Sequence, residues 1–434
     1  MNKISAFVII LALVLSLQNI YADEVVIVTS FPKELFEAYK AAFEAKYPSV
    51  NVVIKSKKTS AAVAYIRETA SKPDSDIVWA SAVDAFAVLK EYGLLEKYQL
   101  PQDIEKNIPE NIGPYPIHDP DNTYFGFALS GYGIMWNKLY MQAHRLKEPK
   151  EWTDLTDPSY YSHLSMSAPS RSGTTHLTVE AILQGYGWEK GWEILLNMAG
   201  NMAAITERSF GVPQGVINGE FGVGIVIDFF GLSAIASEQP VDFVYPSVTP
   251  IVPANIALVK NGPNLKNARK FIQFLLSEEG QLLLFDPAIS RLPVIPKLYS
   301  KAPKGFPNPF EMEMQESEFD INISQERYGL INSLFDQVIT FRLKDLRQAW
   351  KAIYEAEEQI AKRKSRGKNV SKEEALLKEA RSLVTKVPIS EKDANDPGIN
   401  QNFAGEANEI QAKYETQWDS LSKDNYAKAK KIAM

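Results

Sequence analysis

The order of predicted strands and helices limits the folds open to this chain more than any single motif. From residue 23 onward, apolar strands at 25–29, 50–55 and 76–79 alternate with helices at 32–47 and 61–71. A second run of the same kind has strands at 164–168, 203–206 and 223–228, helices at 173–185 and 212–218, and another helix that begins at Phe229. Alternation at this spacing predicts βαβ units with parallel strands, so we expect an α/β fold with two such units.

After the second unit the chain is expected to return to the first. Strands are predicted at 241–245 and 254–260, followed by helices at 267–276 and 278–285 that pack on the first unit. Crossings near 127–137 and 241–255 would join two lobes by a hinge and leave a cleft between them. We expect residues 23–130 and 246–309 to form lobe 1, and residues 131–245 to form lobe 2.

Residues 310–434 are expected to form an all-helical extension. No proline occurs from 327 to 363, where apolar residues recur at helical spacing; Ser371 and Glu374 form a potential capping box, and a third helix is predicted over 403–433. These helices carry charges of both signs, which favours a surface layer packed on the lobes over a coiled-coil arm. Removal of this layer is expected to leave ligand affinity nearly unchanged.

The first 22 residues have the pattern of a secretory signal peptide. Lys3 is followed by an apolar run over 4–17, and Ile20, Tyr21 and Ala22 then precede Asp23. The apolar run is shorter than the roughly 20 residues that cross a bilayer. The chain of 434 residues has no cysteine, which excludes disulfides, thiol catalysis and a lipidated cysteine anchor. We therefore expect a periplasmic protein that is not membrane-anchored and whose mature chain starts near Asp23.

The overall charge argues against nucleic acid as a partner. The formal net charge is −6 and the chain has no long basic run. Any anion must therefore be bound by a local site, against the field of the whole protein.

Hydroxyl groups gather where predicted strands meet predicted helices. Such junctions occur at Ser30, at Thr59 and Ser60, from Ser170 to Thr175, and at Arg208 and Ser209. The first amides of a helix lack internal partners and carry partial positive charge, so these corners are suited to carboxylate or phosphate oxygens. Ser30 and Ser60 are expected to cap the first two helices at the carboxyl ends of strands, which is where ligands bind in open parallel sheets.

The chain resembles a known family through an ordered set of segments. These are VVIVTSFPKELFEAYKAAFEAKYPSVNV, SKKTSAA, SDIVWAS, YGLLEKY, GYGIMWNK, EWTDLTDPSYYSHLSMSAPSRSGT, INGEFGVGIVID and VYPSVTPIVPANIALVKNGPNLKNARKFIQFLLSEEGQ. Over about 24–296 it resembles the type 2 periplasmic substrate-binding proteins of ABC importers, in the branch with ferric-ion, phosphonate and sugar-phosphate binders. The segments RSFGVP and SRLPVIP look most like the phosphoglycerate and hexose-phosphate members. The extension lies outside the resemblance.

The resemblance implies a set of ligand-binding residues and one departure. Iron-binding members use adjacent tyrosines where this chain has Phe229 and Phe230, which argues against ferric iron. The ligand-contacting corners carried over from the family are Ser30, Thr59, Ser60, Trp79 and Ser81 in lobe 1, and Ser170, Arg171, Ser172, Gly173, Thr174, Thr175, Arg208, Ser209 and Asp228 in lobe 2. Hydroxyls, amides and guanidinium groups suit a phosphate, and Asp228 would hold a sugar hydroxyl or an amine.

Several of these residues also have a purely structural explanation. Ser30 and Ser60 would serve as ordinary helix caps, Trp79 as a core residue and Arg171 as a solvated cap residue, while Gly173 would merely permit a turn. Arg208, between a strand and a Ser-Phe-Gly turn, is the stronger candidate for ligand binding.

Enzymatic functions and cofactors are not expected. Ser172 and His176 lie four residues apart on one predicted helix, without a nucleophile elbow or an acid that orients the imidazole. The histidines are scattered, at His118, His144, His163 and His176, and no zinc-binding helix motif is present.

The predicted function is capture of a small anionic, phosphorylated metabolite in the cleft. The resemblance implies delivery of this solute to an ABC permease. The alternative is that the closed form signals to a membrane sensor kinase, with the extension as the partner surface.

Overall fold

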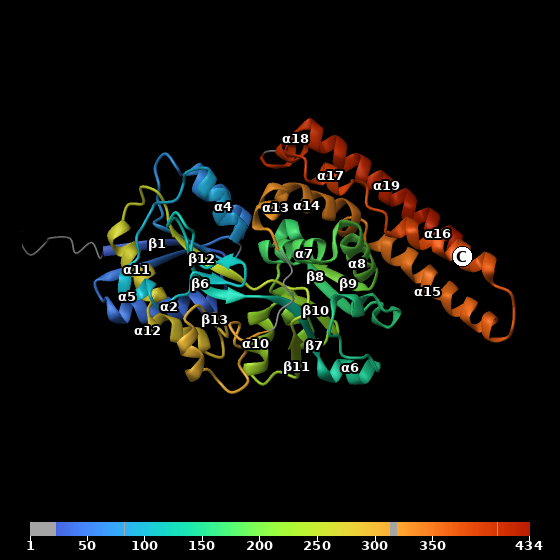
Figure 1. The fold of residues 1–434 in the computed structure, drawn as a ribbon, viewed down its shortest axis with the longest axis horizontal. Coiled ribbons are helices and arrows are strands. Elements are labelled where there is room, and N and C mark those ends of the chain that lie inside the picture. Colours follow the sequence, from blue (N-terminus) through green and yellow to red (C-terminus); the bar gives the residue numbers. More distant parts are fainter. Residues whose placement is uncertain (1–22, 82, 313–318, 406) are drawn as a thin grey trace, which may run out of the picture.

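The computed structural model describes residues 23–81, 83–312, 319–405 and 407–434, and these residues form two large sheets joined by two crossings (Figure 1). A third, two-stranded sheet pairs β4 (Asn111–Ile112) with β5 (Tyr115–Pro116). The first sheet has the order β13-β6-β12-β3-β1-β2. Its strands are β1 (Asp23–Thr29), β2 (Val50–Ser56), β3 (Ile77–Ala80), β6 (Phe125–Ser130), β12 (Val252–Leu258) and β13 (Leu292–Pro293). β1 is parallel to β2 and β3, and β12 is antiparallel to β3 and β6.

Helices cover this first sheet because each has one apolar side. They include α2 (Lys33–Lys46), α3 (Thr59–Glu68), α4 (Val83–Glu91), α11 (Leu265–Leu276) and α12 (Glu278–Leu282). α2 buries Leu35, Tyr39 and Phe43, and α11 buries Phe271 and Phe274 against them. This sheet and its helices are lobe 1.

The second sheet has the order β11-β7-β10-β8-β9. Its strands are β7 (Tyr132–Asn137), β8 (Leu164–Ser167), β9 (Met202–Thr206), β10 (Val223–Ile227) and β11 (Val241–Val244), and its helices include α7 (Gly173–Tyr186), α8 (Trp188–Gly200), α9 (Gly211–Asn218) and α10 (Asp228–Ala236). β8 is parallel to β9 and β10, whereas β7 is antiparallel to β10 and β11. The predicted two-lobed α/β fold is confirmed; its exact boundaries stay a prediction.

The two crossings between the sheets pack directly against each other. Gly131 alone separates β6 from β7, and a Cβ atom there would lie 2.7 Å from Ile251 Cδ1 and 2.9 Å from Tyr245 Cε1. Both of those residues belong to the second crossing, between β11 and β12. A glycine is therefore required where the two crossing segments meet.

The caps predicted for the first two helices are wrong. α2 follows Pro32, and the turn before it is held by Thr29, whose Oγ1 accepts a hydrogen bond from Phe31 N at 3.1 Å, so Ser30 is not the cap. α3 already starts at Thr59, because Ala62 N bonds to the carbonyl of Lys58, and this places Ser60 inside the first turn.

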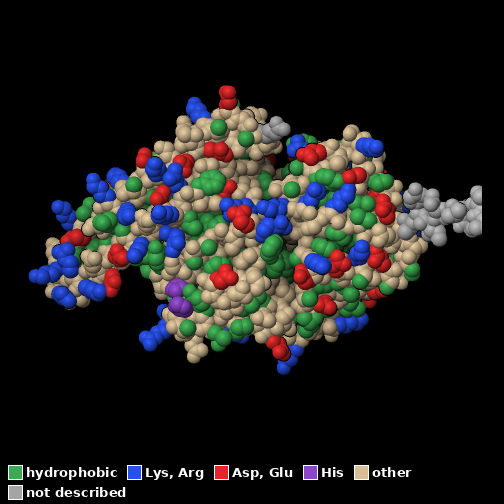
Figure 2. Space-filling model, turned by 180° about the vertical axis from the view of Figure 1, so that it is seen from behind, with side chains coloured by type: hydrophobic (Ala, Val, Ile, Leu, Met, Phe, Trp, Pro, Cys, Tyr) green, Lys and Arg blue, Asp and Glu red, His purple; other side chains and the backbone are tan. Residues whose placement is uncertain are grey.

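The extension is all-helical, as predicted, and it covers α7 and α8 of lobe 2 (Figure 1). Its helices are α13 (Ile321–Glu326), α14 (Tyr328–Phe335), a π-helical turn (Asp336–Thr340), α15 (Leu343–Ser365), α16 (Ser371–Val384), α17 (Glu391–Ala394), α18 (Pro397–Asn400) and α19 (Glu409–Ala433). The potential capping box does not form: Ser371 is the first residue of α16 and the cap position is Val370, with no side-chain bond. Lys and Arg side chains gather at the exposed end of the α15–α16 pair, around residues 362–368 (Figure 2).

The extension shares its core with lobe 2 and is more than a surface layer. Leu330, Leu334 and Trp350 are fully buried in the same apolar cluster as α7 and α8. The Trp350 indole donates a hydrogen bond to Leu196 O at 3.1 Å, and its ring fills the space beside Gly200, where a Cβ atom would be 2.1 Å from Trp350 Cδ1. Removal of these helices would expose that core, so the expectation of nearly unchanged affinity is revised.

Candidate anion-binding cleft

A cleft of about 1060 Å³ separates lobe 1 from lobe 2. Lobe 1 contributes the ends of β1, β2 and β3 to its wall, and lobe 2 contributes the N-terminus of α7, the turn after β9 and the start of α10. A second hollow of about 950 Å³ lies between α3, α4 and the extension. Its Arg67 lies among Glu68, Glu91 and Glu326, so the interlobe cleft is the better anion site.

The N-terminus of α7 forms one wall of the cleft. Ser172 is the N-cap, and its Oγ accepts a hydrogen bond from Thr175 N at 3.3 Å. Gly173 and Thr174 follow at the cleft surface, where the first amides of a helix have no partner within the helix. Thr174 Oγ1 lies 3.5 Å from Ser81 Oγ of lobe 1, so the two lobes meet at this corner.

Two arginines of lobe 2 flank this corner and differ in their partners. Arg171 forms an ion pair with Glu207 at 3.1 Å and donates to Thr206 O at 3.4 Å. Arg208 lies over the Phe210 ring at 5.2 Å, and it makes no ion pair with any residue that the structure describes. Arg208 is therefore the cation that is more available to a ligand.

Most of the predicted ligand-binding residues come together at the cleft, although they come from distant parts of the sequence. Those at its wall are Ser30, Thr59, Ser81, Arg171, Ser172, Gly173, Thr174, Arg208 and Ser209. Ser60 lines the second hollow, while Trp79, Ser170, Thr175 and Asp228 are outside both linings.

Trp79 lies in the core of lobe 1. Its side chain is 0% exposed, and its ring makes edge contacts with Phe31, Tyr39 and Phe127 at centroid distances of 5.2, 5.5 and 5.2 Å. Side chains alternate between the two faces of a strand, and this one faces the helices. We therefore assign Trp79 to the core of lobe 1 and not to stacking against the ligand.

Asp228 holds the two crossings together instead of facing the cleft. Its Oδ2 accepts hydrogen bonds from Gly131 N at 2.7 Å and from the Tyr245 hydroxyl at 3.0 Å, and its Oδ1 accepts one from Phe229 N at 2.7 Å. Burial outweighs these hydrogen bonds and raises the pKa of Asp228 to about 6. Its carboxylate is fully engaged within the hinge, so we no longer assign it to the ligand.

Arg291 is a cleft residue that the sequence does not predict. It precedes β13 and lines the cleft, yet its side chain is 1% exposed. Neither Nη1 nor Nη2 has a hydrogen-bond partner among the described residues. Burial lowers the pKa of Arg291 to about 9, which still leaves the guanidinium charged at neutral pH. Arg291 belongs to the SRLPVIP segment, but it lies in a loop before β13 and not at a strand-to-helix junction, so the local sequence does not indicate a ligand-binding role.

The described residues contain no cluster of metal-binding side chains. No group of three or more His, Asp or Glu side chains within these ranges is placed to hold a metal ion. Phe229 and Phe230 contact each other at a centroid distance of 4.4 Å, and a phenylalanine ring offers no oxygen to a hard cation. In the same part of the chain, no helix has the length and apolar character to cross a bilayer.

Comparison with known proteins gives consistent matches. Residues 73–309 match the family model described as bacterial extracellular solute-binding protein. The phosphoglycerate transport regulatory protein PgtC of Salmonella typhimurium is 30% identical over 377 residues, which cover 87% of this chain and 88% of that protein. The iron uptake protein A1 of Synechocystis is 25% identical over 197 residues, which cover 42% of this chain and 53% of that protein.

Solved structures share the fold of the two lobes. The periplasmic binding protein AfuA from Actinobacillus pleuropneumoniae, solved with exogenous fructose-6-phosphate bound, has a TM-score of 0.64 and 22% identity, covering 72% of this chain and 98% of its own. The periplasmic binding protein P5PA has a TM-score of 0.62 and 21% identity, covering 70% of this chain and 94% of its own. Iron-bound HitA from Pseudomonas aeruginosa has a TM-score of 0.58 and 16% identity, covering 71% of this chain and 98% of its own.

Proposed function

Because this chain belongs to the family of bacterial extracellular solute-binding proteins, we propose that it captures a small phosphorylated metabolite between its lobes and delivers it to an ABC-type permease. The relatives are binding proteins, and we assign no reaction to this chain. Residues 1–22 lie outside the described part of the structure, and we propose that they are a cleaved signal peptide for export to the periplasm.

The observation that carries this proposal is the corner formed by Ser172, Gly173 and Thr174 at the start of α7. A phosphate has several oxygens to satisfy, and the corner offers backbone amides, hydroxyls and the positive end of the helix dipole. Arg171 and Arg208 stand on the same side of the cleft and provide charge-assisted hydrogen bonds. The corner thus supplies local hydrogen-bond donors for an anion, although the protein as a whole has a negative net charge.

The two lobes give a mechanism for selective capture. Ser30, Thr59 and Ser81 of lobe 1 face the α7 corner of lobe 2 across the cleft. A ligand that bonds to both walls stabilises the closed arrangement over the open one, whereas a ligand that bonds to one wall does not. The permease would then receive only the closed, loaded form.

A second candidate is signalling, and the extension favours it. The alignment with PgtC spans 377 residues, which is more than the 309 residues that precede the extension, so the alignment reaches into the extension. The match to AfuA, in contrast, includes 98% of the AfuA chain but only 72% of this chain. The extension is thus shared in part with a relative named as a regulator. In this function the extension, with its basic end, would contact a membrane sensor kinase (Figure 2).

A ligand screen tests the proposed function. The mature chain from Asp23 is heated with 3-phosphoglycerate, hexose phosphates, phosphonates, inorganic phosphate or ferric citrate, and positive compounds are titrated by calorimetry. A ligand at about 100 times its dissociation constant adds about 2.7 kcal/mol of stability. A selective shift with one phosphorylated compound is expected. A shift with ferric citrate and none with any phosphorylated compound would contradict the proposal.

The gene neighbourhood separates the two candidates. Genes for a permease and an ATPase beside this one support delivery, and genes for a histidine kinase and a response regulator support signalling. Neither result identifies the ligand, which only the ligand screen can do.

A further inference from the structure

The lobe 1 wall of the cleft contains a buried cation, Arg291, whose two Nη atoms have no hydrogen-bond partner among the residues that the structure describes. Arg291 lies in the loop before β13, at the edge of the lobe 1 sheet beside the crossing at Gly131. Its guanidinium carbon is 3.4 Å from the centroid of Phe229, a lobe 2 residue, and 4.6 Å from that of Phe31 in lobe 1. Arg291 is therefore held between the two lobes by aromatic rings.

The nearby polar groups do not satisfy this cation. Asp228 is close enough to act on it electrostatically, but its oxygens accept hydrogen bonds from Gly131, Phe229 and Tyr245 instead. Tyr39, a second polar side chain near Arg291, is a neutral phenol and donates its hydroxyl to Gly280 O at 2.8 Å. Both Nη atoms are consequently left without an acceptor in the described part of the chain.

A buried charge without hydrogen-bond acceptors lowers the stability of the fold, because the charge has lost its hydration and gained no partner. Such a group is therefore a candidate for binding a ligand. The contact with the Phe229 ring is a cation–π interaction, which is weaker than a two-pronged bond to an anion. An anionic ligand group would therefore replace the Phe229 ring as the partner of Arg291. The fork of N–H groups matches two oxygens of a carboxylate or a phosphoryl group.

We infer that Arg291 binds a second anionic group of the ligand, separate from the phosphate at the α7 corner. This inference rests on the proposed function and narrows the ligand class to metabolites with two anionic ends. The phosphate binds at Ser172, Gly173 and Thr174 in lobe 2, and the second group binds at Arg291 in lobe 1. The two charges of the ligand then connect the two lobes, which explains how binding favours closure.

The test compares two ligands that differ in one group. 3-Phosphoglycerate has a phosphate and a carboxylate, whereas glycerol 3-phosphate has the phosphate and a hydroxyl group. Both are titrated by calorimetry into the wild type, Arg291→Met and Arg269→Met. Arg269 is a lobe 1 arginine over the Tyr98 ring, outside the cleft lining, so its variant controls for the loss of one positive charge.

The expected result has two parts. Arg291→Met weakens binding of 3-phosphoglycerate about tenfold or more and changes that of glycerol 3-phosphate less than about twofold, while Arg269→Met changes neither. The melting temperature of unliganded Arg291→Met is unchanged or higher, because a buried unpaired charge is replaced by an apolar chain.

Two results would overturn the inference in distinguishable ways. If the wild type binds 3-phosphoglycerate and Arg291→Met binds it equally well, or loses both ligands together with its thermal stability, then Arg291 is structural and the proposed function stands. If the wild type binds neither of these compounds nor any other phosphorylated compound of the screen, the proposed function fails and the inference fails with it.

Discussion

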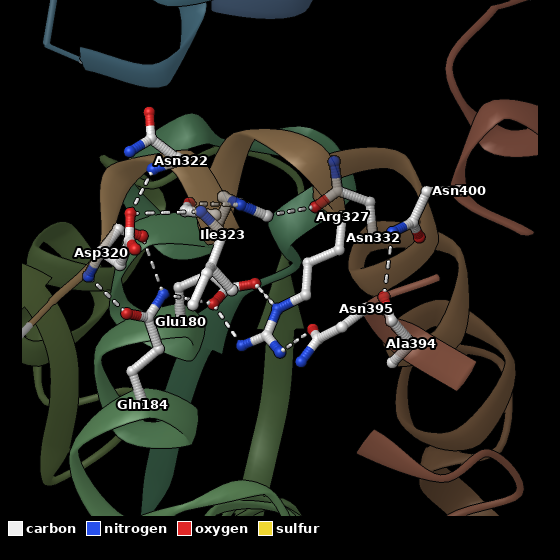
Figure 3. Close-up of polar contacts among 12 residues, drawn as sticks. Glu180, Gln184, Asp320, Asn322, Ile323, Arg327, Asn332, Ala394, Asn395 and Asn400 are labelled. Atoms are coloured by element: carbon white, nitrogen blue, oxygen red, sulfur yellow. Dashed lines mark hydrogen bonds and ion pairs between the residues drawn. The ribbon is translucent and has the colours of Figure 1, made fainter. Parts of the chain in front are cut away.

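Arg327 of the extension and Glu180 of α7 form a buried two-pronged ion pair (Figure 3). Arg327 Nε donates to Glu180 Oε1 at 2.9 Å and Nη2 donates to Oε2 at 2.7 Å, and the two side chains are 3% and 0% exposed. Arg327 Nη1 also donates to Asn395 Oδ1 at 2.9 Å, and Gln184 Nε2 donates to Glu180 Oε2 at 3.0 Å. The pair joins the extension to the helix whose N-terminus forms the anion-binding corner.

Loss of one partner of this pair is predicted to destabilise the protein strongly. Arg327→Met leaves the Glu180 carboxylate buried without its cation, at a cost of about 3–5 kcal/mol. The free energy of unfolding, measured by urea titration of tryptophan fluorescence, reports this loss. The double variant Glu180→Met with Arg327→Met is expected to recover most of it, because the unpaired charge is gone. A double variant as unstable as the single one would contradict this explanation.

The same pair predicts a pH dependence. Burial alone would raise the pKa of Glu180, but the charge and hydrogen bonds of Arg327 outweigh it and leave the pKa below the ordinary value of 4.5. The stability that the pair adds is present above about pH 4.5 and is lost as the pH falls through the lowered pKa. The wild type should therefore lose stability more steeply on acidification than the double variant. Parallel stability curves of the two proteins between pH 6 and pH 3 would show that the pair contributes no such dependence.

The extension is predicted to support the cleft through its buried aromatic contact. Trp350→Ala removes the ring that packs beside Gly200, with an expected loss of about 3–5 kcal/mol. Since α14 contacts the turn Pro169–Arg171 just before the α7 corner, a chain that ends at Phe310 should also bind its ligand more weakly. Trp350→Phe, which keeps much of the apolar volume, serves as the control for Trp350→Ala. If the truncated chain binds its ligand with full affinity, the extension does not support the cleft and is only a surface layer.

The fold was predictable because its signals are local. Apolar strands followed by helices recur from Val25 to Leu276, and each pattern depends only on residues a few positions apart. The π-helical turn Asp336–Thr340 is an exception, because the sequence there has the spacing of one continuous helix while the chain must bend between α14 and α15 to follow lobe 2.

The site was predictable only in part because its contacts are not local. The residues of the α7 corner are contiguous in sequence, and the family resemblance predicts that they bind the ligand. The role of Asp228 depends on Gly131, which is 97 residues away, and that of Trp79 on the rings of Phe31 and Phe127. Arg291 became a candidate only when its burial and its missing partners were known.

Asp228 is predicted to make the hinge sensitive to pH. Burial raises its pKa from 3.8 to about 6, so the folded protein binds a proton more tightly at this group than the unfolded chain does. Its contribution to stability is thus full below about pH 3.8 and falls as the pH rises to about 6, by about 3 kcal/mol at most. Asp228→Asn lacks this titration, so wild type should become less stable relative to the variant between pH 4 and pH 7. Melting temperatures of both proteins across this range test the prediction; a constant difference would contradict it.

Arg208 is predicted to contribute more to ligand binding than Arg171. Arg208 makes no ion pair among the described residues, whereas Arg171 is already bonded to Glu207 and Thr206. Removal of a charge-assisted hydrogen bond costs about 1.5–3 kcal/mol, so Arg208→Ala should weaken binding of the phosphorylated ligand by about 10- to 150-fold. Its unliganded melting temperature should change little, because the side chain is only partly buried.

Arg171→Ala is the matched comparison, since it removes the same charge from the same wall of the cleft. It is expected to weaken binding less, because the guanidinium must share its hydrogen bonds with Glu207. Calorimetric titration of the ligand into both variants gives the ratio of their dissociation constants. If Arg171→Ala weakens binding more than Arg208→Ala, then Arg171 turns from Glu207 to the ligand on closure, and the order of the two arginines at the phosphate is reversed.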